Sequence, residues 1–241
     1  AFGNLLLGVP FHFDLDQRVF YTGSFFGLLN PFALLAGVVS LSMLTMHGAI
    51  YLQLRTDGVV QERARSAALW CGIVFVAAFA AAGVWIATGI DAFRIATMPP
   101  PGSAFMPLAK TVERVSGGWL ANYTQYPWML SAPVLAFGGT LLALVSSRAR
   151  RAGFAFMLSC LGVAGVVLTA GFALFPFIMP SSSDAKSSLT LYDAVSTHRT
   201  LQIMFWVVIL FLPIVIAYTG WAYRMMRGTV TERAVREGGH Y

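Results

Sequence analysis

Five long apolar segments constrain this chain more than any other feature of its sequence. A bilayer core offers no water to backbone amides and carbonyls, so a segment that crosses it needs about 20 apolar residues in helical form. Runs of this kind occupy residues 31–54, 67–90, 128–145, 153–179 and 201–223. We therefore predict an all-α integral membrane protein with five transmembrane helices.

The proportion of charged residues excludes an ordinary soluble domain. Of the 241 residues, 57% are hydrophobic and only 11% are charged, whereas soluble domains carry roughly 25% charged residues. The net charge of +6 does not indicate nucleic-acid binding either. The basic residues lie in short clusters between the apolar runs, not along one face of a polar domain.

The distribution of these basic residues predicts the orientation of the helices. Ten lie on one side, mostly in short loops: Arg55, Arg63, Arg65, Arg148, Arg150, Arg151, Arg224, Arg227, Arg233 and Arg236. Six lie on the other side, in longer segments: Arg18, Arg94, Lys110, Arg114, Lys186 and Arg199. Because short cytoplasmic loops are enriched in positive charge, we expect the first side, with the carboxy-terminal tail, to be cytoplasmic.

This topology divides the chain into a bundle and its flanking segments. We expect residues 1–11 to be the end of a truncated membrane helix, followed by an outer-side loop at 12–30. Residues 31–179 are expected to form a four-helix transmembrane bundle with an outer-side loop at 91–125, in which 104–123 is expected to be an amphipathic surface helix. An outer-side loop at 180–199, a peripheral transmembrane helix at 200–226 and a cytoplasmic tail at 227–241 complete the chain.

Small residues indicate how the first four helices would pack. Helices in lipid gain little by hiding leucine from lipid, so their association relies on close backbone approach. Small residues suited to this are Ala77, Ala78, Ala81, Ala82, Gly138, Gly139, Gly162, Gly165 and Gly171. The run at 201–223 is bulky nearly all round, which favours a position outside the bundle. Pro133, Pro176 and Pro213 are each expected to kink or end a helix.

One ionisable side chain that is a candidate for chemistry, His47, lies within a predicted span. An intramembrane ionisable residue is a functional candidate by default. We weigh three interpretations of His47: a haem ligand, a member of a proton relay, or a structural histidine bonded to a neighbouring helix. The structural interpretation is favoured because Arg55 lies only two turns away, near the interface.

The remaining polar candidates are weaker. Met43 and Met46 are more typical of packing than of haem ligation, and Cys71 and Cys160 are typical of small buried apolar residues. His12, His198 and His240 fall in loops or the tail. The carboxylates Asp14, Asp16, Asp91, Asp184 and Asp193 suit solvated helix ends better than an outer proton gate. No phosphate-binding loop, dinucleotide fingerprint, zinc spacing or nucleophile elbow is present in the sequence, so no active site is recognisable, and we predict no metal site and no catalytic residue.

Several segments carry a resemblance to a known family. These are 3–11 (GNLLLGVPF), 21–32 (YTGSFFGLLNPF), 173–182 (ALFPFIMPSS), 188–193 (SLTLYD) and 200–204 (TLQIM). In these segments the chain resembles subunit II of the cytochrome bd quinol oxidases, and the similarity runs along its whole length. The family's subunit II has nine membrane helices, in two four-helix bundles and one peripheral helix. The resemblance implies that this chain supplies the second bundle and the peripheral helix, and that residues 1–11 end the fourth helix.

The resemblance also implies a function in a respiratory complex of the bacterial inner membrane. The family enzyme oxidises quinol, reduces dioxygen to water and generates a membrane potential. Its haems b558, b595 and d, and so its iron, are expected on the partner, subunit I, which subunit II supports across an apolar interface. Some members bind a structural quinone in subunit II, and small accessory membrane subunits are further expected partners. Residues of the proton and oxygen routes lie mainly in the family's first four helices, so none is assigned to a position here.

Two other functions remain open at this point. A secondary transporter would show broken helices around polar groups at the membrane midplane; the prolines fit this, but the scarcity of such groups does not. A membrane scaffold protein unrelated to respiration is compatible with the composition.

Overall fold

Asn30 and Pro31 begin the first long helix of the chain. In the computed structural model, which describes residues 1–98, 107–225 and 228, the Asn30 side chain accepts a hydrogen bond from the Ala33 amide at 2.8 Å. Proline fits the first position of α2 (Pro31–Arg55) because its missing amide hydrogen has no partner there anyway. Four further helical segments are long and apolar enough to cross a membrane, which confirms the prediction of five such helices. They are α3 (Gly58–Gly89), α5 (Ser131–Arg148) with the short η4 (Pro127–Leu130) before it, α6 (Ala152–Leu174) and α7 (His198–Met225).

Two helix boundaries differ from the predicted ones by five or more residues, each for an identifiable reason. Helix α3 begins at Gly58, nine residues before the apolar run at 67, because charged residues such as Glu62 continue the helix beyond the apolar stretch. Helix α6 ends at Leu174 and not at 179. Pro176 lacks an amide hydrogen and disfavours helical geometry in the residue before it.

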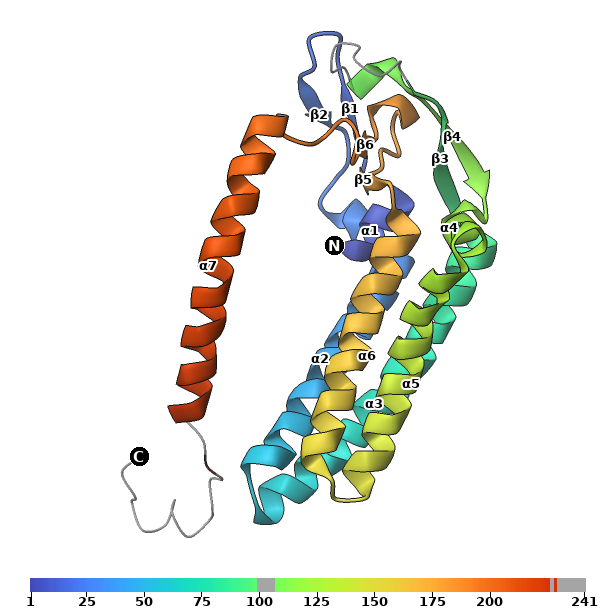
Figure 1. Ribbon diagram of the computed structural model, residues 1–241. Helices are drawn as coiled ribbons and strands as arrows, with labels where there is room; N and C mark the ends of the chain where they lie inside the picture. The colour runs from blue at the N-terminus through green and yellow to red at the C-terminus, as the bar shows by residue number, and fades with distance from the viewer. Residues whose placement is uncertain (99–106, 226–227, 229–241) are drawn as a thin grey trace.

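Helices α2, α3, α5 and α6 form a four-helix bundle, with α2 beside α3 and α5 beside α6 (Figure 1). The α5–α6 contact depends on glycine. A Cβ at Gly165 would lie 2.4 Å from the Ala136 amide nitrogen, and one at Gly139 would lie 2.8 Å from the Gly162 nitrogen. Gly138 and Gly171 face no neighbouring atom within 4 Å. Three of the five glycines expected to allow close packing therefore do so.

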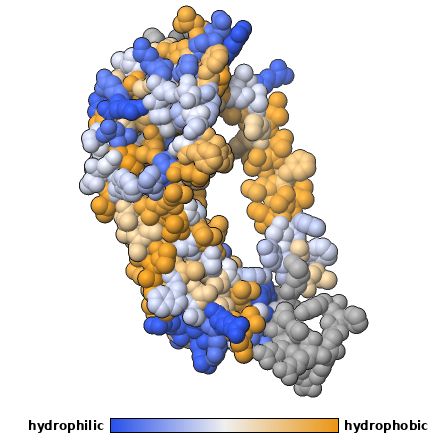
Figure 2. Space-filling model, turned by 180° about the vertical axis from the view of Figure 1, so that it is seen from behind, coloured by the Kyte–Doolittle hydropathy of each residue, from blue (hydrophilic) through white to orange (hydrophobic). Residues whose placement is uncertain are grey.

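Helix α7 lies apart from the bundle (Figure 1). None of its residues is buried within the described part of the chain. Figure 2 shows apolar residues over the middle of the bundle and of α7, with hydrophilic residues gathered toward both ends of the molecule. This is the hydropathy profile of a chain whose helices lie in lipid.

A cap of short elements covers one end of the bundle (Figure 1). Its described residues form three antiparallel strand pairs: β1 (Phe11–Phe13) with β2 (Val19–Tyr21), β3 (Asp91–Thr97) with β4 (Thr111–Ser116), and β5 (Phe177–Met179) with β6 (Leu189–Thr190). Short helices accompany the strands at this end of the molecule: α1 (Phe2–Leu7), η1 (Phe26–Leu28), η2 (Pro107–Ala109), η3 (Gly118–Leu120), α4 (Ala121–Gln125) and η5 (Ala185–Ser187).

The predicted amphipathic helix at 104–123 is wrong for much of its length. Residues 111–116 form strand β4, and only the short stretches 107–109, 118–120 and 121–123 are helical among the described residues; residues 104–106 lie outside the described residues. The segment pairs with β3, where Phe93 faces Arg114 and Ile95 faces Val112. Pairing of these β-branched and aromatic side chains outweighs the helical preference of the segment.

Residues 1–11, expected to be the end of a membrane helix, contain the short helix α1 and an extended segment. Gly8 adopts a φ of 85°, which ends the helix. The chain then turns into the cap, where the Val9 amide donates to the Pro180 carbonyl at 2.8 Å.

Candidate functional site: the polar cap and the intramembrane histidine

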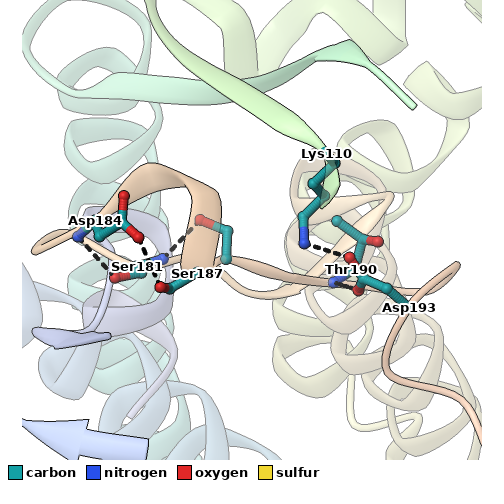
Figure 3. Close-up of polar contacts among 7 residues, drawn as sticks. Lys110, Ser181, Asp184, Ser187, Thr190 and Asp193 are labelled. Atoms are coloured by element: carbon teal, nitrogen blue, oxygen red, sulfur yellow. Dashed lines mark hydrogen bonds and ion pairs between the residues drawn. The ribbon is translucent and has the colours of Figure 1, made fainter. Parts of the chain in front are cut away.

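Ser181 is the centre of a hydrogen-bond network in the loop after α6 (Figure 3). Its hydroxyl donates to the Phe11 carbonyl and accepts from the Asp184 amide at 3.2 Å. Ser187 donates to the Asp184 carboxylate at 2.7 Å and accepts from the Phe13 amide at 3.0 Å. The loop that follows α6, predicted from the sequence only as an outer-side loop, is thus bonded to β1, 170 residues away along the chain.

A second contact in the cap is a buried ion pair between Lys110 and Asp193 (Figure 3). The two side chains are 2% and 12% exposed. The other oxygen of the Asp193 carboxylate accepts from the Thr190 amide at 2.6 Å. Asp193 therefore fastens the segment before β4 to the loop that leads to α7.

Three side chains attach the cap to the helices. Trp119 donates from Nε1 to the Leu6 carbonyl at 3.1 Å, and Asn122 donates to the carbonyls of Phe172 and Phe175 at 2.8 and 2.6 Å. Tyr123 donates to the Thr169 carbonyl at 2.7 Å. Burial raises the pKa of the Tyr123 phenol to about 12, so this donor keeps its proton through the physiological range.

His47 lies in the carboxy-terminal half of α2 and contacts α6. Its Nδ1 is 2.8 Å from the Ser159 hydroxyl, and its ring stacks on Phe156 with centroids 5.0 Å apart. The Ser159 hydroxyl donates to the Phe156 carbonyl at 2.7 Å. Since that hydrogen is used, His47 Nδ1 is assigned as the donor to Ser159, which leaves Nε2 as the unprotonated nitrogen of the neutral ring.

The other sequence candidates do not converge on a common site within the described residues. Met46 is fully buried among apolar side chains, and Met43 packs with Val39, Phe75 and Ala78. His12 stacks on Phe20 in the first hairpin and His198 begins α7, while His240 lies outside the described residues. Asp14 accepts from the Arg18 amide at 2.8 Å, and Asp16 and Asp91 are exposed. Cys71 is half-buried and Cys160 is exposed, and both are free thiols.

Metal-ligating side chains are not clustered in the part of the chain that the structure describes. No group of three or more histidine, cysteine, aspartate or glutamate side chains is placed to hold a metal ion in the ranges 1–98 and 107–225. Phe156 covers one face of the His47 imidazole, the one intramembrane imidazole among the described residues, and the imidazole Nδ1 is engaged with Ser159. An apolar recess of about 470 Å³ has no side-chain hydrogen-bond donor for a quinone carbonyl; its lining residues are Met129, Val167, Leu168, Gly171, Phe172 and Phe175.

Sequence reasoning missed the side chains that hold the cap and the bundle together. Lys110, Asn122 and Tyr123 are examples in the cap, and the 2.7 Å hydrogen bond from Ser147 to Gln53 joins α5 to α2. The signal available was a polar side chain in an otherwise apolar segment. That signal identifies a group that needs a partner, but it does not identify the partner.

Comparison with known proteins identifies the family of this chain. The family model for cytochrome bd terminal oxidase subunit II matches residues 1–226. The chain is 44% identical, over 240 residues, to cytochrome bd-I ubiquinol oxidase subunit 2 of Escherichia coli K12 and 43% identical to the probable cytochrome oxidase subunit 2 of Haemophilus influenzae. It is 27% identical, over 233 residues, to cytochrome bd ubiquinol oxidase subunit 2 of Bacillus subtilis.

The matches cover nearly all of this chain but only part of its relatives. They include 100% of the chain for the first two proteins and 96% for the third, and they span 63%, 63% and 59% of those proteins' own lengths. The family match extends from the first residue through α7. The chain belongs to the cytochrome bd terminal oxidase subunit II family.

Proposed function

We propose that this chain is part of subunit II of a cytochrome bd-type terminal oxidase, which oxidises quinol and reduces dioxygen to water in an aerobic electron-transport chain. The family match over residues 1–226 is the observation that supports this proposal. The chain's relatives from Escherichia coli and Bacillus subtilis are ubiquinol oxidase subunits.

In this complex the chain supports a haem-bearing subunit I. The haems b558, b595 and d belong to that partner, and the residues of this chain contribute packing surface and a rigid cap instead of iron ligands. The exposed apolar side chains of α7 and of the bundle suit contact with lipid or with a membrane partner. A structural quinone and small accessory subunits are further components that we propose for the complex.

We further propose that the chain is a multi-pass protein of the bacterial inner membrane with its carboxy terminus in the cytoplasm. The clustering of Arg55, Arg63, Arg65, Arg148 and Arg224 at the end of the helices opposite the cap supports this orientation.

Affinity purification tests the proposed function. The chain is tagged in its native setting, and the membranes are solubilised in a mild detergent. We expect a haem-bearing polypeptide and quinol-dependent oxygen consumption to co-purify with the tag, and an unrelated multi-pass protein with the same tag to recover neither. Recovery of the tagged chain without a haem-bearing partner would contradict the proposal. Stoichiometric haem bound to this chain alone would contradict the proposal that the haems belong to subunit I.

A further inference from the structure

A cavity lies between the carboxy-terminal ends of α2 and α7, at the end of the molecule opposite the cap. It is lined by Arg55, Gly220, Tyr223 and Arg224, and its volume is about 370 Å³. Arg55 is the last residue of α2, and Arg224 lies in the last turn of α7. Guanidinium-bearing side chains from two separate helices therefore border one cavity.

Arg55 has unused hydrogen-bonding capacity beside this cavity. Its Nε is shielded from solvent and has no hydrogen-bond partner among the described residues. The guanidinium carbon lies 5.6 Å from the centre of the Tyr51 ring, which positions the group by a cation–π contact. Within the described part of the chain, the one ion pair joins Lys110 to Asp193, so neither Asp57 nor Glu62 forms an ion pair with Arg55.

These properties point to an anionic ligand. Arginine is permanently charged, and a donor of a charged group that is buried without an acceptor is costly. The planar guanidinium group matches the oxygens of a phosphate, and the Tyr223 hydroxyl can donate a further hydrogen bond to them. A phosphate group satisfies this donor set.

The position of the cavity indicates the source of the phosphate. The ends of transmembrane helices lie at the level of lipid headgroups. Leu52, one turn before Arg55, is 45% exposed, and Ile216, one turn before Gly220, is 61% exposed. Polar donors at the helix ends thus continue into apolar surface toward the membrane interior, as a phospholipid requires and a free phosphate ion does not.

We propose that this cavity binds the phosphate of an anionic phospholipid, with its headgroup between Arg55 and Arg224 and its acyl chains along α2 and α7. Basic recesses between membrane helices are known to take such headgroups. The chain connects α7 to the bundle through the cap, at the opposite end (Figure 1). A lipid bound by both arginines would join α7 to α2 where no peptide segment does so in the described residues.

The test compares lipid retention by the intact complex that contains this chain. The complex is washed free of loosely bound lipid in a neutral detergent, exposed to mixed micelles of either phosphatidylglycerol or phosphatidylcholine, and analysed by quantitative lipid mass spectrometry. The cavity variant is R55Q/R224Q. The matched control is R148Q/R151Q, which removes the same charge at the same end of the molecule, from the exposed ends of α5 and α6.

We expect the native complex and the control to retain phosphatidylglycerol, and the cavity variant to retain roughly tenfold less at limiting lipid. Retention of the zwitterionic phosphatidylcholine should be low and equal in all three. Equal losses in the two double variants would overturn the proposal, because they would indicate general attraction to a basic surface. Unchanged retention by the cavity variant would overturn it as well.

Two further arms complete the design. Addition of inorganic phosphate alone should not displace the phosphatidylglycerol; displacement would identify a site for free phosphate and overturn the lipid assignment. The single variant R224Q changes an exposed position and should keep the complex assembled, which size-exclusion chromatography checks. It is expected to lose part of the retained lipid, and the same retention as in the native complex would count against the site.

Discussion

Two polar contacts illustrate what single residues do in this chain. The Lys110–Asp193 ion pair joins parts of the cap that are 83 residues apart, and the His47–Ser159 hydrogen bond joins α2 to α6 across 112 residues. Both contacts connect separate elements, and both are shielded from bulk water. Their loss therefore affects tertiary structure and leaves each helix intact.

Replacing Asp193 with asparagine should destabilise the cap. Lys110, whose side chain is 2% exposed, would lose the carboxylate that it contacts, and breaking a buried pair by removing one partner costs about 3–5 kcal/mol. The measurement is the thermal inactivation temperature of the purified complex, which should fall. Asp91→Asn is the control, because Asp91 is an exposed carboxylate at the start of β3. Equal inactivation temperatures for the two variants would show that the ion pair contributes little.

Replacing His47 with glutamine should leave the chemistry of the complex nearly intact. Glutamine keeps a hydrogen-bond donor for Ser159 but cannot ligate iron as imidazole does or relay a proton in the same way. If His47 is structural, haem content and quinol-dependent oxygen consumption should stay within about twofold of native. Loss of either in a complex that still assembles would instead identify His47 as a ligand or relay residue.

At the scale of elements, α5 and α6 pack through backbone contact. Gly139 and Gly162 lie opposite each other, and Gly165 lies against Ala136. Small residues at such positions let two helices approach closely, which matters in lipid because apolar side chains gain little from leaving it. The stability of the α5–α6 packing should therefore fall more when a methyl group is added at these contact positions than when one is removed.

Gly165→Ala and Gly171→Ala form a matched pair on α6. A Cβ at Gly165 would lie 2.4 Å from the Ala136 nitrogen and 2.7 Å from the Ala132 oxygen, whereas one at Gly171 meets nothing within 4 Å. Overpacking costs about 1–3 kcal/mol, and alanine gains up to about 1 kcal/mol over glycine in a helix. Thermal unfolding in detergent should show Gly165→Ala to be less stable than native and Gly171→Ala to be equal or more stable. The reverse order would contradict the observed α5–α6 packing.

The long helices could be predicted from the sequence, but the β3–β4 hairpin of the cap could not. A run of about 20 apolar residues is a local signal, so α2 matches its prediction to within one residue. Strand β4 depends on β3, which lies about 20 residues earlier, and its Val112 and Val115 fit a strand or an amphipathic helix equally well when read alone. The partner strand decides between them, and a partner is not encoded locally.

The contacts of the cap were beyond prediction for a related reason. Asp193 is recognisable as a carboxylate near the start of α7, but its lysine lies 83 residues away. His47 was identified because it is ionisable and lies within a span, whereas its partner, Ser159, is an ordinary residue of a membrane helix. The sequence thus identifies groups that need a partner, and only the fold supplies the pairing.

At the scale of the whole molecule, the two ends differ in both structure and charge. One end carries the cap, with its three strand pairs and its buried ion pair. The other end consists of short turns after α2 and α5, flanked by arginines, and the end of α7. Folded protein covers the bundle at the first end, while at the second end the bundle helices are joined by short turns (Figure 1).

This asymmetry predicts which end faces the cytoplasm, and reporter fusions measure it. Arginines in short loops resist translocation, so the end opposite the cap should stay inside and the cap should lie in the periplasm. Alkaline phosphatase needs disulfides that form outside the cytoplasm. Inserted after Met98 in the cap, it should be active, and fused after Gly228 it should be inactive. Green fluorescent protein in the same two positions should give the opposite pattern, which controls for expression and insertion. Active phosphatase after Gly228, with no activity after Met98, would invert the topology and show that the cap, not the arginine clusters, sets the orientation.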